Sequence, residues 1–167
     1  MSILGKILTI GALLAVAACT NSTGYGDGSG GPGGSGASAG SVSDPSSPAY
    51  FQQSVGDRVL FVVDQSTLTD AARATLQAQA EWMLTNTDYS AIIEGHADEQ
   101  GTREYNLGLG EKRANAAREF LVSRGVAGNR LKVVSYGKER PIEICSDESC
   151  YSKNRRAVTV LSSGLTG

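Results

Sequence analysis

Four short runs of apolar and β-branched residues predict four β-strands. They cover residues 58–63, 89–93, 131–136 and 156–161, and the first of them reads RVLFVV. Runs of this length and composition are typical of strands that pack against a hydrophobic core. The chain therefore has one predicted strand before residue 64, one near its middle and two towards its end.

Residues 66–84 show the period of a helix. Ala72, Leu76, Ala80 and Met83 recur at a spacing that places them on one face. This pattern predicts an amphipathic helix with that face buried. The side chains that could cap its amino terminus are Ser66, Thr67 and Thr69.

A second helix is predicted over residues 102–124. Gly125 follows its apolar stripe, and helices commonly end at such a glycine. The stripe should pack against the same sheet as the first helix. It consists of Leu107, Gly110, Ala114, Ala117 and Leu121, with Phe120 beside it.

The resulting order of elements is β-α-β-α-β-β, which indicates an α+β fold. We expect a two-layer sandwich in which two main helices cover one face of a mixed four-stranded sheet. The predicted domain extends over residues 50–167.

The amino-terminal region has a different composition and is not expected to join this domain. Lys6 precedes an apolar run at residues 7–18, which is too short to span a bilayer stably and is typical of a secretory signal. The sequence VAAC at its end predicts a lipoprotein signal peptide over residues 1–18, with Cys19 as the lipidated residue. An ordinary signal peptide followed by a chance cysteine is the alternative.

Residues 19–49 are predicted to form the lipidated Cys19 followed by a flexible tether. The segment is rich in Gly, Ser and Pro and contains no Lys or Arg. Such a composition cannot bury enough apolar surface to offset the loss of chain entropy. As a flexible coil of about 30 residues it would span about 30 Å on average, so the domain should act away from a membrane surface.

Charge and cysteine content narrow the possible functions. The chain has 15 basic and 17 acidic side chains and lacks the basic excess of a nucleic-acid-binding protein. If Cys19 is lipidated, Cys145 and Cys150 remain, and an even number of cysteines in an exported chain favours a disulfide. A metal site is the alternative, but two thiols and one distant histidine offer at most three ligands. We predict no metal, no cofactor and no nucleic-acid partner.

Candidate chemistry is concentrated in EGHADEQGTREYN, residues 94–106, which contains the single histidine, His96. His96 and Asp98 could form a general-base pair, and a small hydrolase or metal enzyme built on them is an open alternative. The sequence contains neither G-x-S-x-G nor H-E-x-x-H, however. The lack of both signatures favours a binding protein over an enzyme.

Asp98 lies where the second strand leads to the second helix, a common position for binding residues. The helix N-terminus attracts anionic groups, Asp98 attracts a cation, and Arg113 can offer a planar fork to a carboxylate. Together these groups suit a zwitterionic, amino-acid-like ligand. The alternatives are a turn or capping role for Asp98 and a solvated surface charge for Arg113.

Three segments resemble a known family: EGHADEQGTREYNLGLGEKRANAAREFLVSRGV, RLKVVSYGKERP and NRRAVTVL. They are similar to the OmpA-like peptidoglycan-binding domain and, among its members, to the peptidoglycan-associated lipoproteins. The resemblance covers residues 50–161 and agrees with the predicted anchor and tether. It implies a non-enzymatic lipoprotein of the outer membrane that faces the periplasm and has peptidoglycan, TolB and the Tol complex as partners.

The resemblance also implies a non-covalent hold on meso-diaminopimelate in the stem peptides of peptidoglycan. Asp98 would pair with the ammonium group of this ligand, and Arg113 would meet its carboxylate. In FVVD, residues 61–64, valine stands before the aspartate where the family usually has phenylalanine. The further pocket residues implied are Val63, Asp64, Asn106 and Leu107.

The segment from Pro141 to Asn154 departs from the family, because CSDESC replaces a stretch that is often free of cysteine. We predict a loop here, pinned by a disulfide between Cys145 and Cys150. Asn154 and Arg155 match the family motif, and their alternative role is to support the fold through hydrogen bonds. A wall-tethering lipoprotein outside the Tol system is the alternative to a Tol–Pal role in envelope integrity and cell division.

Overall fold

The computed structural model describes residues 40–163. The predicted signal peptide, the predicted lipidation site at Cys19 and most of the predicted tether lie outside the described residues. Among the described residues, no helix combines the length and the apolar character needed to cross a membrane.

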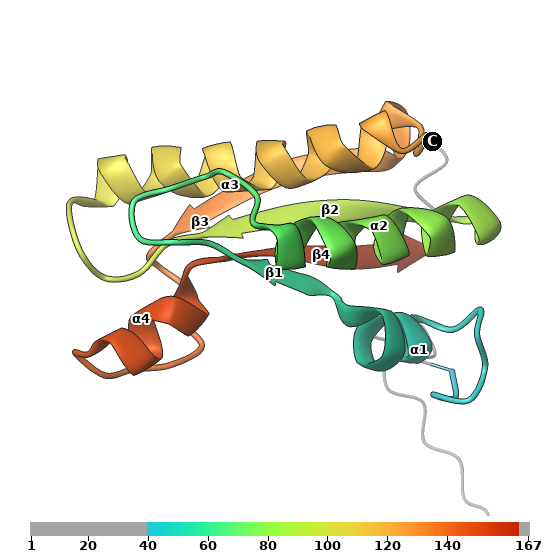
Figure 1. Ribbon diagram of the computed structural model, residues 1–167, viewed down its shortest axis with the longest axis horizontal. Coiled ribbons are helices and arrows are strands. Elements are labelled where there is room, and N and C mark those ends of the chain that lie inside the picture. Colours follow the sequence, from blue (N-terminus) through green and yellow to red (C-terminus); the bar gives the residue numbers. More distant parts are fainter. Residues whose placement is uncertain (1–39, 164–167) are drawn as a thin grey trace, which may run out of the picture. The chain divides into compact units, whose positions relative to one another are not determined.

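Helices and strands alternate along most of the described chain (Figure 1). The main elements follow the predicted β-α-β-α-β-β order and confirm the α+β class. In chain order the elements are α1 (Pro48–Tyr50), the π-helical turn η1 (Phe51–Gly56), β1 (Arg58–Leu60), α2 (Asp70–Thr85), β2 (Tyr89–His96), α3 (Arg103–Ser123), the 3₁₀ turn η2 (Gly128–Arg130), β3 (Leu131–Gly137), α4 (Glu148–Asn154) and β4 (Arg156–Ser163).

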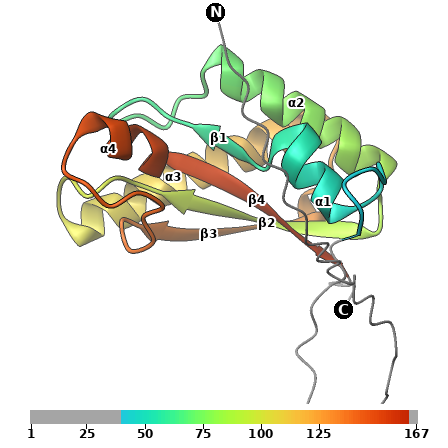
Figure 2. The ribbon, with the colours of Figure 1, turned by 90° about the horizontal axis from the view of Figure 1, so that it is seen from below.

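The strands of the described chain form one mixed sheet in the order β1-β4-β2-β3. β4 is antiparallel to both β1 and β2, whereas β2 and β3 are parallel. α2 and α3 lie on the same face of this sheet, and Figure 2 shows α3 behind the strands. The predicted two-layer arrangement is confirmed.

The face of α2 that the sequence predicted to be buried packs against the sheet. Thr69 caps the helix, because its side chain accepts a hydrogen bond from the backbone N–H of Ala72. Phe51 from the η1 turn, which the pattern did not predict, completes the core beside Trp82, with ring centroids 4.9 Å apart. The buried apolar side chains of α2 include Ala72, Leu76, Ala80 and Met83.

The buried face of α3 differs from the predicted one. Leu107 is 49% exposed, so the prediction that it begins the buried stripe is wrong, and Asn106 and Arg113 are buried instead. The helix approaches β2 closely, since a Cβ atom on Gly95 would lie 1.8 Å from the carbonyl oxygen of Gly110. This approach covers the two polar side chains. The other predicted stripe residues are buried: Gly110, Ala114, Ala117 and Leu121.

Two strands end at positions that the sequence did not predict. β1 ends at Leu60 instead of residue 63, and the chain beyond it turns through Asp64, which has a left-handed φ of 56°. β2 continues beyond residue 93 to His96, with a register shift between Gly95 and His96. Both differences move loop residues to the same end of the sheet.

The predicted loop between residues 141 and 154 contains a helix, α4, so the prediction is wrong for residues 148–154. Asp147 caps this helix by accepting a hydrogen bond from the backbone N–H of Ser149 at 2.8 Å. A disulfide joins Cys145 to Cys150, with their Cα atoms 5.8 Å apart. The pattern did not predict α4 because the helix is short and mostly polar.

Candidate functional site

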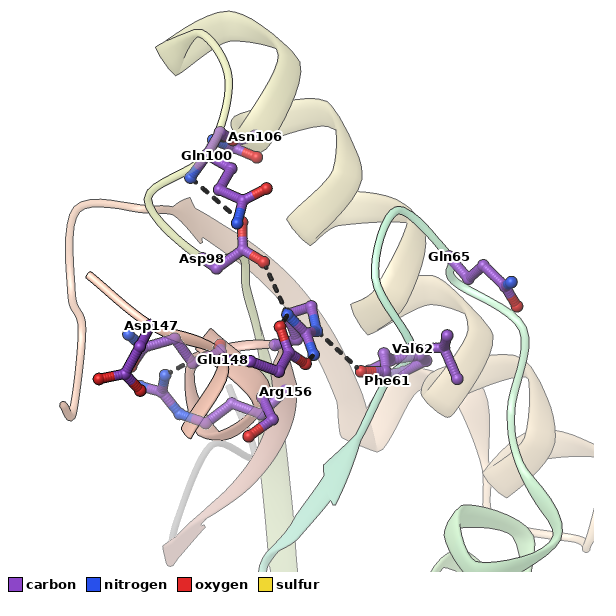
Figure 3. Close-up of polar contacts among 12 residues, drawn as sticks. Phe61, Val62, Gln65, Asp98, Gln100, Asn106, Asp147, Glu148 and Arg156 are labelled. Atoms are coloured by element: carbon purple, nitrogen blue, oxygen red, sulfur yellow. Dashed lines mark hydrogen bonds and ion pairs between the residues drawn. The ribbon is translucent and has the colours of Figure 1, made fainter. Parts of the chain in front are cut away.

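A cavity of about 340 Å³ lies between the loop that follows β1, the loop that follows β2 and the start of α3. It brings together four of the residues that the sequence predicted as a site: Val63, Asp64, Asp98 and Asn106. The other lining residues are Gln100, Gly101, Tyr105 and Leu109. Figure 3 shows Asp98, Gln100 and Asn106 at the start of α3.

Asp98 is only 7% exposed, and both of its carboxylate oxygens accept hydrogen bonds. One oxygen accepts from the backbone N–H of Gln100 at 3.2 Å, and the other accepts from a guanidinium nitrogen of Arg155 at 3.0 Å. Hydrogen bonds to both oxygens, one of them from a cation, hold the side chain in one orientation. Asp98 therefore offers a fixed negative charge at the cavity wall.

The loop that carries Asp98 is tied to α3 and to the end of β3. The side-chain amide of Asn106 donates to the carbonyl oxygen of Gln100 at 2.7 Å. The ammonium of Lys138 donates to the carbonyl oxygen of Gly101 at 2.7 Å. Thr102 caps α3, as its hydroxyl accepts from the backbone N–H of Tyr105. These bonds hold the site in place before any ligand arrives.

Arg113 lies beneath the cavity and does not line it. It is fully buried, and its guanidinium donates to the carbonyl oxygens of Gln65 at 2.8 Å, His96 at 2.9 Å and Val62 at 3.2 Å. Burial lowers the pKa of Arg113 to about 10, against the opposing influence of the nearby Asp98 carboxylate. Its donors tie the loop after β1 to β2, so the predicted fork already holds backbone carbonyls.

Asp64 reaches the cavity from the loop after β1. It is the one described residue other than glycine with a positive φ, and such backbone strain is often found at ligand sites. The exposed Tyr105 donates its hydroxyl to the Asp64 carboxylate, and this hydrogen bond raises the pKa of the tyrosine. The contact joins the two sides of the cavity mouth.

Arg155 is the site residue whose role the sequence did not settle. It is 4% exposed and pairs with the Asp98 carboxylate, while its Nε donates to the carbonyl oxygen of Phe61 at 3.2 Å. Asn154 supports the fold, since its side chain bonds the backbone of Ile142 and Glu143. The available signal was the match of Arg155 to the family motif.

Leu107 lies away from the Asp98 cavity. It lines a second cavity of about 440 Å³. The structure therefore does not bring Leu107 together with the other predicted site residues. The remaining lining residues of this second cavity are Arg103, Glu104, Ser135, Tyr136 and Glu139.

His96 is buried but is not among the residues that line the Asp98 cavity. Among the described residues neither ring nitrogen has a hydrogen-bond partner, and the nearest Glu94 oxygen is 3.7 Å from Nε2. Burial lowers its pKa to about 4, helped by the positive charges of Arg156 and Arg140. Because a general base works best with a pKa near the operating pH, His96 is poorly suited to that role at neutral pH.

The sequence matches the OmpA family over residues 60–155. It is 48% identical over 156 residues to the peptidoglycan-associated lipoprotein of Mesorhizobium japonicum, covering 93% of this chain and 90% of that protein. Its identity to the peptidoglycan-associated lipoprotein of Rhizobium meliloti is 50% over 155 residues, covering 89% and 82%. The chain belongs to the OmpA family and, within it, to the peptidoglycan-associated lipoproteins.

Solved structures agree with this assignment. The peptidoglycan-associated lipoprotein from Burkholderia pseudomallei is 37% identical, with a TM-score of 0.64, over 72% of this chain and 98% of that one. The C-terminal domain of Helicobacter pylori MotB is 20% identical, with a TM-score of 0.61, over 65% of this chain and 86% of that one. At that identity the second likeness concerns the fold alone.

Proposed function

We propose that this protein binds peptidoglycan non-covalently through the meso-diaminopimelate of its stem peptides. The observation that carries the proposal is the buried, hydrogen-bonded Asp98 carboxylate in the wall of a cavity of about 340 Å³. The names of the relatives support the choice of ligand, since each is a peptidoglycan-associated lipoprotein. The protein acts by holding the wall and not by cutting it.

The charges around the cavity favour a ligand that presents an ammonium group. Asp64 and Asp98 are both lining residues, and within the described part of the chain the lining contains no Lys or Arg. The ammonium of diaminopimelate would donate to Asp98. Asn106 and the backbone of the loop at residues 98–101 would contact the neighbouring polar groups of the stem peptide.

Arg113 provides positive charge under this cavity, which favours a ligand carboxylate above it. All of its guanidinium nitrogens donate to backbone carbonyls. Three of its five N–H groups are used in this way. Because Arg113 is fully buried, a ligand carboxylate could reach the other two only if the chain that covers the guanidinium moved. The loop after β1 is the part that would move, because it supplies two of the three carbonyls.

The cellular role follows from the relatives and from the amino-terminal sequence. We infer that Cys19 carries the lipid, that residues 19–49 form a tether, and that the anchor is in the outer membrane. The domain at residues 50–167 would then link this membrane to the wall from the periplasmic side, as part of the Tol–Pal system in envelope integrity and cell division. Failure of the purified protein to bind TolB would leave a wall tether outside the Tol system.

Co-sedimentation with purified sacculi tests the ligand directly. The unlipidated chain should sediment with sacculi whose stem peptides contain meso-diaminopimelate, and less with sacculi that contain lysine instead. Asp98→Asn should stay in the supernatant, whereas Asp88→Asn, at the turn between α2 and β2, should sediment like the wild type. Equal sedimentation of the Asp98 and Asp88 variants would contradict the proposal.

The same assay separates wall binding from catalysis. Sacculi incubated with the protein should release no soluble fragments, with or without a chelator. Release of fragments that is lost in His96→Ala would instead favour the hydrolase alternative.

A further inference from the structure

The helix α4 lies at the same end of the molecule as the loop between β2 and α3 in both Figure 1 and Figure 2. Its first residue, Glu148, reaches Arg155, which is the partner of Asp98. The close-up in Figure 3 shows Asp98 and Glu148 in one cluster of polar side chains. A segment outside the cavity wall is thus connected to the central carboxylate of the candidate site.

The three charged groups form a row in which the sign alternates. One guanidinium nitrogen of Arg155 donates to Asp98 at 3.0 Å and to Glu148 at 3.2 Å. A second nitrogen of Arg155 donates to the other oxygen of Glu148. The hydrogen bond that Arg155 donates to Glu148 is the main cause that raises the pKa of Arg155, so the arginine stays charged. Two carboxylates share one cation, which leaves one net negative charge in the row.

This sharing matters for any ligand with an ammonium group. A guanidinium that faced Asp98 alone would neutralise that carboxylate and reduce its attraction for a second cation. Glu148 offsets part of the positive charge of Arg155 and accepts hydrogen bonds from two of its guanidinium nitrogens. Arg155 can then hold the Asp98 side chain in position without cancelling its charge.

The position of Glu148 depends on local features that belong to this segment. The disulfide between Cys145 and Cys150 closes a short loop around it. Asp147 caps the helix directly before Glu148, and Asn154 fixes the other end of α4 to the backbone of Glu143 at 2.8 Å. An exposed carboxylate is therefore presented at a fixed place.

We propose that Glu148, held in place by α4 and its disulfide, is a positioning residue that keeps Asp98 available to the ammonium group of the ligand. This inference rests on the proposed function, because it concerns the same ligand site. The side chain of Glu148 is 69% exposed, and charge pairs at that exposure have modest effects. We expect Glu148→Gln to weaken binding by about two- to fivefold.

Titration calorimetry or quantitative sedimentation with sacculi that contain meso-diaminopimelate tests this at low salt. Glu148→Gln keeps an acceptor for Arg155 and removes only the charge. The matched control is Glu143→Gln, because Glu143 is 43% exposed and pairs with Lys153 at 3.0 Å, away from Asp98. Melting temperatures of both variants should stay close to that of the wild type.

Two further measurements separate an electrostatic role of Glu148 from a purely structural one. They are the salt dependence of binding and the effect of removing the disulfide. The difference between wild type and Glu148→Gln should shrink at about 1 M salt, where the screening length falls to about 3 Å. Replacing both cysteines with serine should weaken binding of the wild type, and adding Glu148→Gln to that background should weaken it little further.

The outcomes distinguish the two proposals. Binding by wild type with equal or tighter binding by Glu148→Gln would overturn the role of Glu148 and leave the ligand assignment intact. An equal loss in Glu143→Gln would also overturn it. Absence of sacculus binding by the wild type would overturn the proposed function and this inference together.

Discussion

His96 and Asp98 are two residues apart and both buried, but their polar atoms have opposite hydrogen-bonding environments. The Asp98 oxygens both accept hydrogen bonds, one of them from a cation. Among the described residues the His96 ring nitrogens have no partner, and the ring packs on Tyr136 with centroids 5.5 Å apart. Burial alone therefore does not distinguish the two residues, and the difference between them lies in whether their polar atoms have hydrogen-bond partners.

Arg113 donates to the backbone of His96 and is influenced by the Asp98 charge, and its replacement should have the largest effect. Arg113→Ala would leave the carbonyl oxygens of Val62, Gln65 and His96 without their donor in a buried place. We expect a loss of about 3–5 kcal/mol in the free energy of unfolding. Urea denaturation measures it, and Arg118→Ala, on the same helix, is the control. A stable Arg113→Ala variant that only loses sacculus binding would show that the arginine acts mainly on the ligand.

Asp98→Ala should have the next largest effect, and on binding instead of folding. Removing one partner of a desolvated charge pair commonly reduces binding by about 2–5 kcal/mol. Arg155 would still have Glu148 as a partner, so the melting temperature should change much less than in Arg113→Ala. Sacculus affinity measured beside thermal melting gives both numbers. A large drop in melting temperature would mean that Asp98 is structural, as Arg113 is.

Acid should act through His96. Its pKa is about 4 in the folded protein and about 6.5 in an unfolded chain. Between these two values the histidine is protonated in the unfolded state and neutral in the folded state, so acid favours unfolding. The contribution of His96 to the free energy of unfolding should be fully present above pH 6.5. It should fall by up to about 3 kcal/mol as the pH drops to about 4. Urea denaturation of wild type and His96→Leu over this range isolates the effect. Parallel curves for the two proteins would contradict the assigned cause.

The smallest effect is expected for His96→Leu at neutral pH. The leucine replaces two nitrogens that have no hydrogen-bond partner in the described chain, so unfolding free energy should change by less than about 1 kcal/mol. His96→Ala leaves a gap beside Tyr136 and should be less stable than His96→Leu, with sacculus binding nearly unchanged in both. Loss of binding in His96→Leu would erase the contrast with Asp98.

The sequence pattern correctly predicted the buried residues where these are apolar and recur at regular helical spacing. Ala72, Leu76, Ala80 and Met83 were predicted as one face and are buried together. It failed on α3 because hydrophobicity favours Leu107 as the inward residue. The close approach of Gly95 and Gly110 instead turns Asn106 and Arg113 inward, where they bond to backbone groups. A search for apolar residues at helical spacing cannot find a buried polar residue that forms hydrogen bonds with the backbone.

The candidate site shows the same limit. Asp98 could be found from the sequence, because a carboxylate between a strand and a helix N-terminus is recognisable locally. Its partner Arg155 lies 57 positions further along the chain and meets it only through the sheet. Glu148 was hidden for a different reason, since it acts through a short helix in a segment that the pattern assigned to a loop.

The order of strands sets when this site can exist. β4 is the last strand of the described chain, yet it lies between β1 and β2 and pairs with both. A chain that emerges amino terminus first therefore cannot complete its sheet until its final segment has arrived. Arg155 precedes that strand directly, so Asp98 acquires its partner in the same late step. The proposed site should therefore become complete only when β4 has paired with both of its neighbours.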